Sequence, residues 1–241
     1  MRLRAGGASL VFEPRGGRVV SLALDGRELL LPTVDSIVGG LYPMAPFAGR
    51  IRRGVLDFEG LHRLPLNLPP HAIHGTVFLR DWTRDGDDWR VDLGPDWPFP
   101  GEARQRLTLA SDHVRFTLTV RAQARMPVTI GWHPWFHGGR VRARPVEQYR
   151  RDSDGVPDGT RVPPTLGPWD DCFLLEEPPA VEISGRTISL SSDCSHWVIY
   201  DQRPDAVCVE PQSGPPDAPN LGLATILEAG ASLTRWFRIG W

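Results

Sequence analysis

Lysine is absent from the 241-residue sequence, and all 27 of its basic residues are arginine. Without a lysine amine the chain cannot form a Schiff base, which excludes pyridoxal-phosphate chemistry and imine-forming aldolases. A Walker-type P-loop needs lysine after its glycines and is excluded as well. The composition, rich in Arg, Gly, Pro and Ala, is typical of a GC-rich genome, which explains the absence. The exclusions hold whatever the cause.

A strong charge of either sign and long apolar runs are also lacking. The net charge is −2 and the pI about 6.4, which does not indicate nucleic-acid binding. No run approaches the ~20 apolar residues of a membrane span, and Met1–Gly7 leads into no long apolar segment, so we expect neither membrane attachment nor a signal peptide. Cys172, Cys194 and Cys208 form no CxxC pair. We therefore expect reduced, buried thiols in a cytoplasmic protein.

Helical periodicity is missing too. The 25 glycines and 24 prolines recur along the whole chain, which argues against long helices. The periodic segments favour strands instead. Val114–Gln123 alternates between apolar and polar residues, and Arg18–Leu24 runs through Asp25-Gly26 into Arg27–Leu31, a β-hairpin pattern. Short strands separated by Gly/Pro turns predict an all-β sandwich or barrel.

The chain length is compatible with one all-β domain spanning residues 1–241. At this size roughly 70–75% of the unfolded surface can be buried, so no metal or disulfide is needed for stability. The polar, turn-rich stretch Tyr149–Leu166 is expected to be a long loop within this domain.

Four segments place polar residues inside strand-like sequence. In the first, Pro46–Gly54 (PFAGRIRRG), an extended backbone would place Arg50 and Arg52 on one face and Arg53 on the other. Arginine presents a planar fork of donors that suits hydroxyls, carboxylates or phosphates. A solvated surface turn explains the pattern equally well.

The second segment, Pro69–Trp82 (PPHAIHGTVFLRDW), contains His71 and His74, followed by Gly75. The i,i+3 spacing suits two metal ligands, but no further Cys or His stands at a fixed offset. An ordinary hydrogen-bonded histidine is the simpler explanation, and we predict no metal site.

The third segment is Thr129–Phe136 (TIGWHPWF). If it is extended, His133 and Trp135 point the same way while Trp132 points into the core. An imidazole beside an aromatic face suits a sugar, whose C–H face packs on the ring while its hydroxyls meet the polar group. Histidine also exchanges protons readily near neutral pH. A buried structural histidine is the alternative.

The fourth segment is Ala206–Asn220 (AVCVEPQSGPPDAPN). Val207 and Val209 would face the core, and Glu210 and Gln212 would face away from it. A carboxylate at a strand end before a rigid Pro-rich loop is well placed to act as a base, although a surface glutamate is the simpler possibility. In an intervening turn (PWDDCF), an aspartate could accept hydrogen bonds from a substrate.

Taken in this order, the blocks PFAGRIRRG, HAIHGTVFLRDW, GWHPWF and VEPQSGPPDAPN resemble the aldose 1-epimerase (mutarotase) family, and the resemblance covers about Leu22 to Asn220. It implies a large antiparallel β-sandwich with the site in an open cleft on one sheet. It also implies interconversion of the α and β anomers of a hexose by acid/base ring opening, with no cofactor.

The resemblance assigns roles residue by residue. Glu210 matches the catalytic base, His133 the general acid, and His74 a second histidine that holds and polarises the sugar. Arg50 matches a family arginine, and Asp170 an aspartate that binds sugar hydroxyls. The candidate substrate-binding residues also include Trp135 and Gln212.

Two departures from the family pattern concern substrate preference. Gly49 stands where the family usually has Asn, and Thr76 follows His-Gly where many members have a second Gly. Asp171, beside the matching aspartate, leaves the register there open. We predict that Glu210 is ionised and that His133 can donate a proton in the resting enzyme.

Three alternatives remain at this point. A hexose-6-phosphate mutarotase would use the Arg50, Arg52 and Arg53 cluster to bind phosphate. A non-catalytic carbohydrate-binding protein would need neither acid nor base. A metal hydrolase would use His74, His133 and Glu210 as ligands. In each of the sugar-binding cases the partner is a small-molecule sugar and the chain is a monomer or homodimer.

Overall fold

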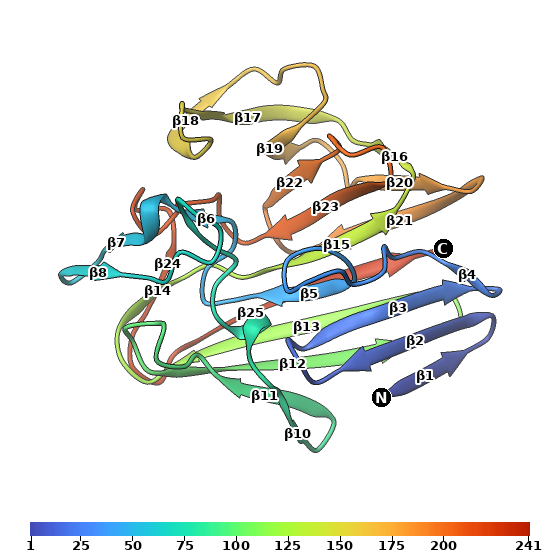
Figure 1. Ribbon diagram of the computed structural model, residues 1–241, viewed down its shortest axis with the longest axis horizontal. Helices are drawn as coiled ribbons and strands as arrows, with labels where there is room; N and C mark the ends of the chain where they lie inside the picture. The colour runs from blue at the N-terminus through green and yellow to red at the C-terminus, as the bar shows by residue number, and fades with distance from the viewer.

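The structure, a computed structural model, describes residues 1–241, and its regular secondary structure is almost entirely antiparallel β-strand (Figure 1). Its two helical segments are single 3-10 turns, and neither is long and apolar enough to cross a membrane. The all-β prediction is confirmed. Several central strands, such as β13 (His113–Ala122) and β22 (His196–Tyr200), contain β-branched and aromatic residues, which favour strands.

The first large sheet has eleven strands in the order β1-β2-β3-β5-β15-β23-β22-β19-β17-β18, with β4 paired to β3. Their bounds are β1 (Arg2–Ala5), β2 (Ala8–Glu13), β3 (Arg18–Leu24), β4 (Arg27–Glu28), β5 (Leu41–Met44), β15 (Gly131–His137), β17 (Pro145–Arg151), β18 (Pro157–Val162), β19 (Asp170–Leu175), β22 (His196–Tyr200) and β23 (Ala206–Gln212).

The second large sheet has eight strands in the order β10-β11-β12-β13-β25-β21-β20-β16. Their bounds are β10 (Thr83–Asp85), β11 (Asp88–Asp92), β12 (Gly101–Leu109), β13 (His113–Ala122), β16 (Arg140–Arg142), β20 (Ala180–Ile183), β21 (Arg186–Ser192) and β25 (Ser232–Gly240).

Three two-stranded sheets and the two turns complete the fold. They are β6 (Arg50–Ile51) with β9 (Ala72–Ile73), β7 (Val55–Asp57) with β8 (Leu61–Arg63), β14 (Met126–Val128) with β24 (Thr225–Leu227), and the turns η1 (Arg52–Gly54) and η2 (Val77–Leu79).

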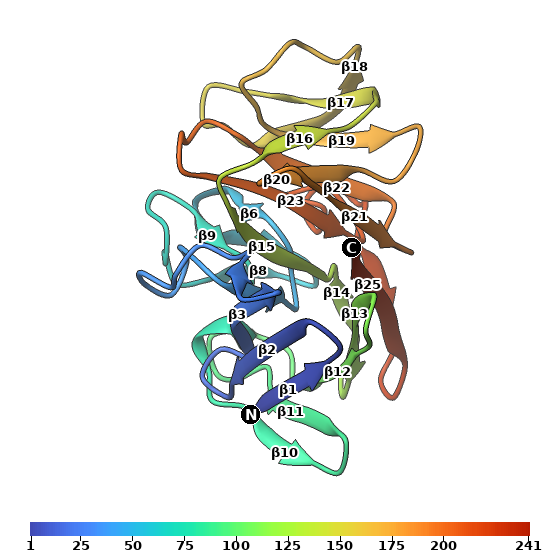
Figure 2. The ribbon, with the colours of Figure 1, turned by 90° about the vertical axis from the view of Figure 1, so that its right-hand side faces the viewer.

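The main core lies between the two large sheets. In Figure 2, β12, β13 and β25 of the second sheet lie beside β1, β2 and β3 of the first. Trp132 of β15 and Phe237 of β25 meet across the interface with ring centroids 5.9 Å apart. Val207 and Val209 belong to the same core. Because side chains alternate along a strand, Glu210 of β23 projects from the opposite face of the first sheet.

The predicted hairpin after β3 is confirmed. Asp25 and Gly26 both have positive φ, 50° and 77°, as a two-residue type I′ turn requires. The predicted burial of Cys172, Cys194 and Cys208 is confirmed too, and all three are free thiols.

The prediction of a loop over Tyr149–Leu166 is wrong, because β17 and β18 pair there as an antiparallel hairpin. The Asp152 carboxylate accepts a hydrogen bond of 2.9 Å from the Asp154 backbone N–H and closes the connecting turn. Charged residues on both faces of the hairpin hide its strand alternation in the sequence.

Candidate active site

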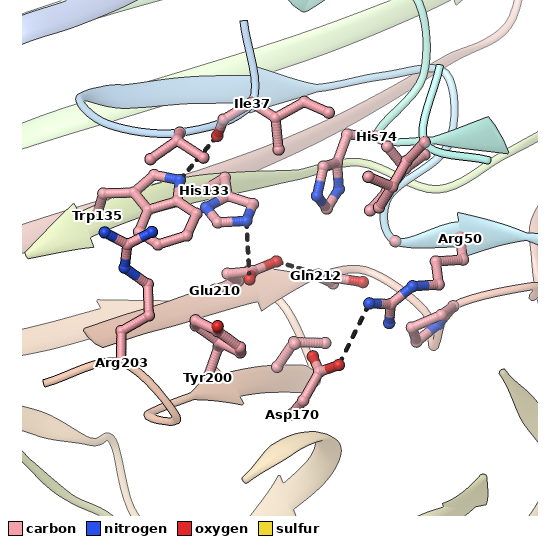
Figure 3. Close-up of a pocket in the computed structure, with 16 residues that line it drawn as sticks. Ile37, Arg50, His74, His133, Trp135, Asp170, Tyr200, Arg203, Glu210 and Gln212 are labelled. Carbon is pink, nitrogen blue, oxygen red and sulfur yellow. Dashed lines mark hydrogen bonds and ion pairs between the residues drawn. The ribbon is translucent and has the colours of Figure 1, made fainter. Parts of the chain in front are cut away.

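The proposed acid and base lie opposite each other on two central strands of the first sheet. The register pairs Gly131 with Gln212 and Trp135 with Cys208, so His133 and Glu210 face one another between these pairs. His133 Nε2 lies 3.2 Å from a carboxylate oxygen of Glu210, and both residues are buried. The two side chains that the sequence assigned to proton transfer are therefore in direct contact (Figure 3).

His74 reaches the same place from a strained loop after β9. Its φ is 60°, a left-handed conformation that costs a non-glycine residue of order 1–3 kcal/mol and that concentrates at functional sites. The next residue, Gly75, also has positive φ, and a Cβ there would overlap the Ala45 carbonyl. The loop thus places the His74 ring edge-on to that of His133, with centroids 4.8 Å apart.

Arg50 and Asp170 close the other end of the site. The Arg50 guanidinium lies 3.2 Å from the Asp170 carboxylate, which also binds Arg151 at 3.1 Å. Asp171 binds Arg151 at 2.8 Å and does not line the pocket. Of the two adjacent aspartates, only Asp170 lines the pocket.

These side chains surround a pocket of about 280 Å³. It is lined by Ile37, Val38, Gly49, Arg50, Leu68, Ile73, His74, His133, Trp135, Asp170, Val198, Tyr200, Arg203, Glu210, Gln212 and Pro216. All seven predicted site residues are among them. A small concave site with convergent polar groups on apolar walls is the usual form of a small-molecule site.

Two neighbours complete the surroundings of the acid–base pair. The Gln212 side-chain amide donates a hydrogen bond of 3.0 Å to the Glu210 carboxylate. Gln212 therefore contacts the proposed catalytic base. Trp135 stacks on His133 with centroids 5.2 Å apart and an interplanar angle of 17°. Both residues line the pocket, and their role in sugar binding stays a prediction.

Unpaired polar atoms gather at this site. Five buried side-chain nitrogen or oxygen atoms in the protein lack a hydrogen-bond partner, and three of them belong to His74, His133 and Gln212. Buried polar groups nearly always have a hydrogen-bond partner, so a buried atom without one needs an explanation. Their concentration at one pocket indicates a polar ligand.

Burial moves the proton affinities of the acid–base pair in opposite directions. It raises the pKa of Glu210 to about 8, with a further contribution from Asp170. It lowers the pKa of His133 to about 3, helped by the positive charges of Arg18 and Arg50. At neutral pH the pair therefore shares one proton, which resides on the carboxyl. The sequence analysis predicted an ionised Glu210 and a proton-donating His133 in the resting site. Both predictions are wrong, because burial disfavours the charged form of each group.

The same three side chains also form a possible metal-ligand set. One ligand atom each from His74, His133 and Glu210 lies within 4.8 Å of the others. This is the two-histidine, one-carboxylate set considered from the sequence. The same proximity serves direct proton exchange between His133 and Glu210.

The sequence matches the family model described as aldose 1-epimerase over residues 1–240. The chain belongs to the aldose 1-epimerase family. Sequence comparison with curated proteins gives no match.

Solved structures share the aldose 1-epimerase fold with this chain at low sequence identity. A putative aldose 1-epimerase from Escherichia coli K12 aligns with a TM-score of 0.86 at 19% identity, covering 99% of this chain and 97% of that one. A galactose mutarotase-like protein from Clostridium acetobutylicum aligns with a TM-score of 0.79 at 20% identity, covering 99% and 93%. A galactose 1-epimerase from Lactobacillus acidophilus NCFM also has a TM-score of 0.79, at 17% identity, covering 99% and 92%. These likenesses confirm the fold.

The two departures from the aldose 1-epimerase pattern have local explanations. At Gly49, which has a φ of 71°, a Cβ would stand 2.7 Å from the Pro216 side chain. An asparagine there would displace this wall of the pocket. Thr76 is buried and donates a hydrogen bond of 2.5 Å from its hydroxyl to the Leu93 carbonyl.

The predicted arginine face does not form. The extended segment ends at Ile51, and the η1 turn directs Arg52 and Arg53 away from the pocket. Arg52 pairs with Asp152 at 2.6 Å, and Arg53 pairs with Asp154 at 3.0 Å.

His71 is structural. Its Nδ1 accepts a hydrogen bond of 3.1 Å from the Arg53 backbone N–H, and its Nε2 lies 3.0 Å from the Asp154 carbonyl. His71 therefore connects η1 to the β17–β18 hairpin. Of the two histidines at i,i+3 spacing, only His74 lines the pocket.

Sequence reasoning missed several pocket residues. Ile37 and Val38 come from the loop before β5, and Tyr200 and Arg203 from the end of β22 and the loop after it. No motif surrounds them, and only the pairing of β5, β15, β23 and β22 brings them together.

Proposed function

We propose that this protein is an aldose 1-epimerase that interconverts the anomers of a free sugar by acid/base ring opening. The observation that carries the proposal is the buried His133–Glu210 contact of 3.2 Å at the base of a polar pocket. Ring opening needs one group that accepts the C1 hydroxyl proton and one that protonates the ring oxygen. Two such groups in contact supply both functions.

The proton balance follows from the pair itself. Transfer of the shared proton from Glu210 to His133 Nε2 generates a carboxylate base and an imidazolium acid. The carboxylate removes the proton from the C1 hydroxyl while the imidazolium protonates the ring oxygen, and the bond between C1 and the ring oxygen breaks. The open-chain aldehyde rotates about C1–C2, and the reverse proton transfers close the ring on the other face. The pair ends with the one proton it began with.

The remaining polar groups are suited to holding the sugar. His74 has an unpaired ring nitrogen in the site, and its pKa is lowered well below the ordinary value by burial and by His133. It is therefore neutral and available to bind hydroxyls. Asp170 offers acceptor oxygens, and Arg50 offers donors beside it. Trp135 borders the pocket with an aromatic ring of the kind that packs against sugar C–H groups.

The charge around the pocket favours an unphosphorylated sugar. Arg50 is already paired with Asp170, and Arg203 is paired with Asp205 through two contacts of 2.9 and 2.8 Å. Because the other two arginines of the predicted cluster bind aspartates outside the pocket, no arginine without a carboxylate partner lines it. A phosphate there would have to displace an existing ion pair.

The test is anomerisation by Glu210→Gln. Polarimetry on freshly dissolved α-glucose and α-galactose should show catalysis by the wild-type protein and more than a ~100-fold loss of turnover in the variant. Glu177→Gln, which changes an exposed carboxylate, is the matched control and should retain wild-type rates. Near-normal turnover by a folded Glu210→Gln variant would refute the assignment.

A further inference from the structure

A row of side chains crosses the first sheet and leads away from the acid–base pair. Val19 of β3 pairs with Leu41 of β5, so the antiparallel register places Arg18 opposite Tyr42. Tyr42 in turn pairs with His133 of β15. Arg18, Tyr42 and His133 therefore lie side by side on three neighbouring strands. No sequence motif marks the first two.

The members of this row are in contact through their side chains. The Arg18 guanidinium carbon lies 4.4 Å from the centre of the Tyr42 ring, within the range of a cation–π interaction. The Tyr42 ring stacks on the His133 imidazole with centroids 5.0 Å apart and an interplanar angle of 22°. His133 also stacks on Trp135. The imidazole is thus held by two near-parallel aromatic rings, one of which carries the arginine.

Arg18 also fixes the loop that precedes β5. Its guanidinium donates a hydrogen bond of 2.6 Å to the Gly39 carbonyl and another to the Ser36 carbonyl. Arg18 is 4% exposed, and its donors go to backbone carbonyls rather than to a carboxylate. Its positive charge is therefore buried close to the acid–base pair with no anion in direct contact, and the Asp35 and Glu13 carboxylates act on it only from a greater distance.

The two aromatic rings hold the same loop. The Tyr42 hydroxyl donates to the Ile37 carbonyl at 2.9 Å, and the Trp135 indole N–H donates to it at 2.8 Å. Ile37 and Val38 form one wall of the pocket, and Figure 3 shows the indole contact beside His133. The two rings that stack on the His133 imidazole, Tyr42 and Trp135, therefore also hold the Ile37–Val38 wall in place.

We propose that Arg18 is a positioning residue: through Tyr42 it fixes the His133 imidazole, and through the loop it fixes the Ile37–Val38 wall. The buried guanidinium charge also disfavours protonation of the His133 imidazole. The kinetic part of this role rests on the proposed function, whereas the structural part does not. An imidazolium that forms beside a buried cation is a stronger acid, but it also forms in a smaller fraction of the molecules. The expected gain in kcat therefore comes from the positioning of the His133 ring, and the charge is tested through the His133 titration.

The surroundings of His133 agree with this role. The titratable and charged groups that face it from the neighbouring elements are Arg18 from β3, Tyr42 from β5, Arg50 from β6, His74 from the loop after β9, and Glu210 from β23. Burial is the main cause of the lowered His133 pKa, and Arg18 is the largest charge contribution. Glu210 is the one acidic group in direct contact.

The experiment compares two substitutions at one position. Arg18→Met removes the charge and the donors but keeps much of the side-chain volume, and Arg18→Lys keeps the charge but loses the two-pronged hydrogen bonding. Arg115→Met is the matched control, because Arg115 makes a surface cation–π contact with Trp236 at 4.2 Å. The readouts are the His133 titration, followed by NMR of isotopically labelled histidine, and KM and kcat for anomerisation.

The expected pattern separates the two parts of the role. Arg18→Met should raise the proton affinity of His133 roughly tenfold, the effect of a unit charge about 10 Å away at an effective dielectric constant of about 20. Because the Tyr42 and His133 rings also lose their support, it should lower kcat about three- to tenfold and raise KM. Arg18→Lys should raise KM with the His133 titration unchanged. Arg115→Met should change none of these quantities.

Several outcomes would overturn the proposal. A folded Arg18→Met protein with the wild-type His133 titration removes the electrostatic part, and an unchanged KM in Arg18→Lys removes the loop part. If Arg18→Met does not fold, Arg18→Lys decides alone: the proposal requires its KM to rise while its His133 titration stays unchanged. If the wild-type protein does not catalyse anomerisation, the proposed function fails, while the NMR titrations still test the position and charge of Arg18.

Discussion

The pH dependence of kcat/KM is the sharpest expectation from the site, because this constant reports the pKa values of the free enzyme. The reaction requires one proton on the Glu210–His133 pair. Burial sets the upper limit of this state at the Glu210 pKa of about 8 and the lower limit at the His133 pKa of about 3. Below the lower limit both groups are protonated and no base is left. Above the upper limit neither holds a proton and no acid is left.

The predicted profile of kcat/KM is therefore broad. It is flat from about pH 4 to pH 7, half-maximal near pH 8, and falls roughly tenfold for each further pH unit. Two solvent-exposed groups with ordinary pKa values would instead give a narrow maximum between those of Glu and His, with activity already falling near pH 6.5.

The assay is polarimetry in non-interacting buffers, with the uncatalysed rate subtracted at each pH because hydroxide accelerates anomerisation. Gln212→Met is an informative companion, since the Gln212 amide stabilises the Glu210 carboxylate. Its loss should shift the alkaline limb to higher pH. A wild-type profile centred between pH 5 and 6, with activity halved near pH 6.5, would contradict the shared-proton description.

Four further expectations can be checked independently. In thermal or urea unfolding at pH 8, Glu210→Gln should be more stable than wild type by a few kcal/mol. A carboxyl whose pKa rises on folding destabilises the native state as the pH increases from about 4.5 to 8, and glutamine lacks this effect. The difference in unfolding free energy should vanish near pH 4. Asp170→Asn should raise KM about tenfold with a smaller effect on kcat, and an unchanged KM would remove this residue from the sugar contacts. Initial-rate comparison should favour glucose over glucose 6-phosphate. Activity should survive dialysis against a chelator, whereas a loss restored by Zn²⁺ would support the metal-ligand set.

The sequence predicted the site better than it predicted the surrounding loops. Alternation along β15 and β23 placed His133 and Glu210 on one face and Trp132 in the core, and the structure confirms both orientations. These predictions succeeded because the side-chain period of a strand is fixed, so a short block specifies which residues share a face. They did so although β15 and β23 each contain a proline, which cannot donate to the sheet.

The errors have a common physical origin in long-range contacts. Arg52 leaves the predicted face because it pairs with Asp152 from a distant hairpin, and nothing near it in the chain signals that partner. The prediction that Glu210 is ionised was wrong because its pKa is raised by burial, and this burial exists only once the sheets have assembled. Arg18 and Tyr42 were missed because no local sequence pattern indicates that they lie beside His133. Only the pairing of β3, β5 and β15 brings the three residues together.

The order of strands around the acid–base pair has a consequence for how activity develops during folding. The row from Arg18 to Glu210 joins four strands that are far apart in the sequence. β3 and β5 lie near the beginning of the chain, β15 just past its middle and β23 near its end. Hairpins such as β12–β13 can form locally, but this row closes only through pairings of high sequence separation, which are slow to form. Catalysis should therefore be among the last properties regained on refolding, and a nascent chain that still lacks β23 has no active site. Recovery of anomerisation reports completion of the whole sheet rather than formation of its parts.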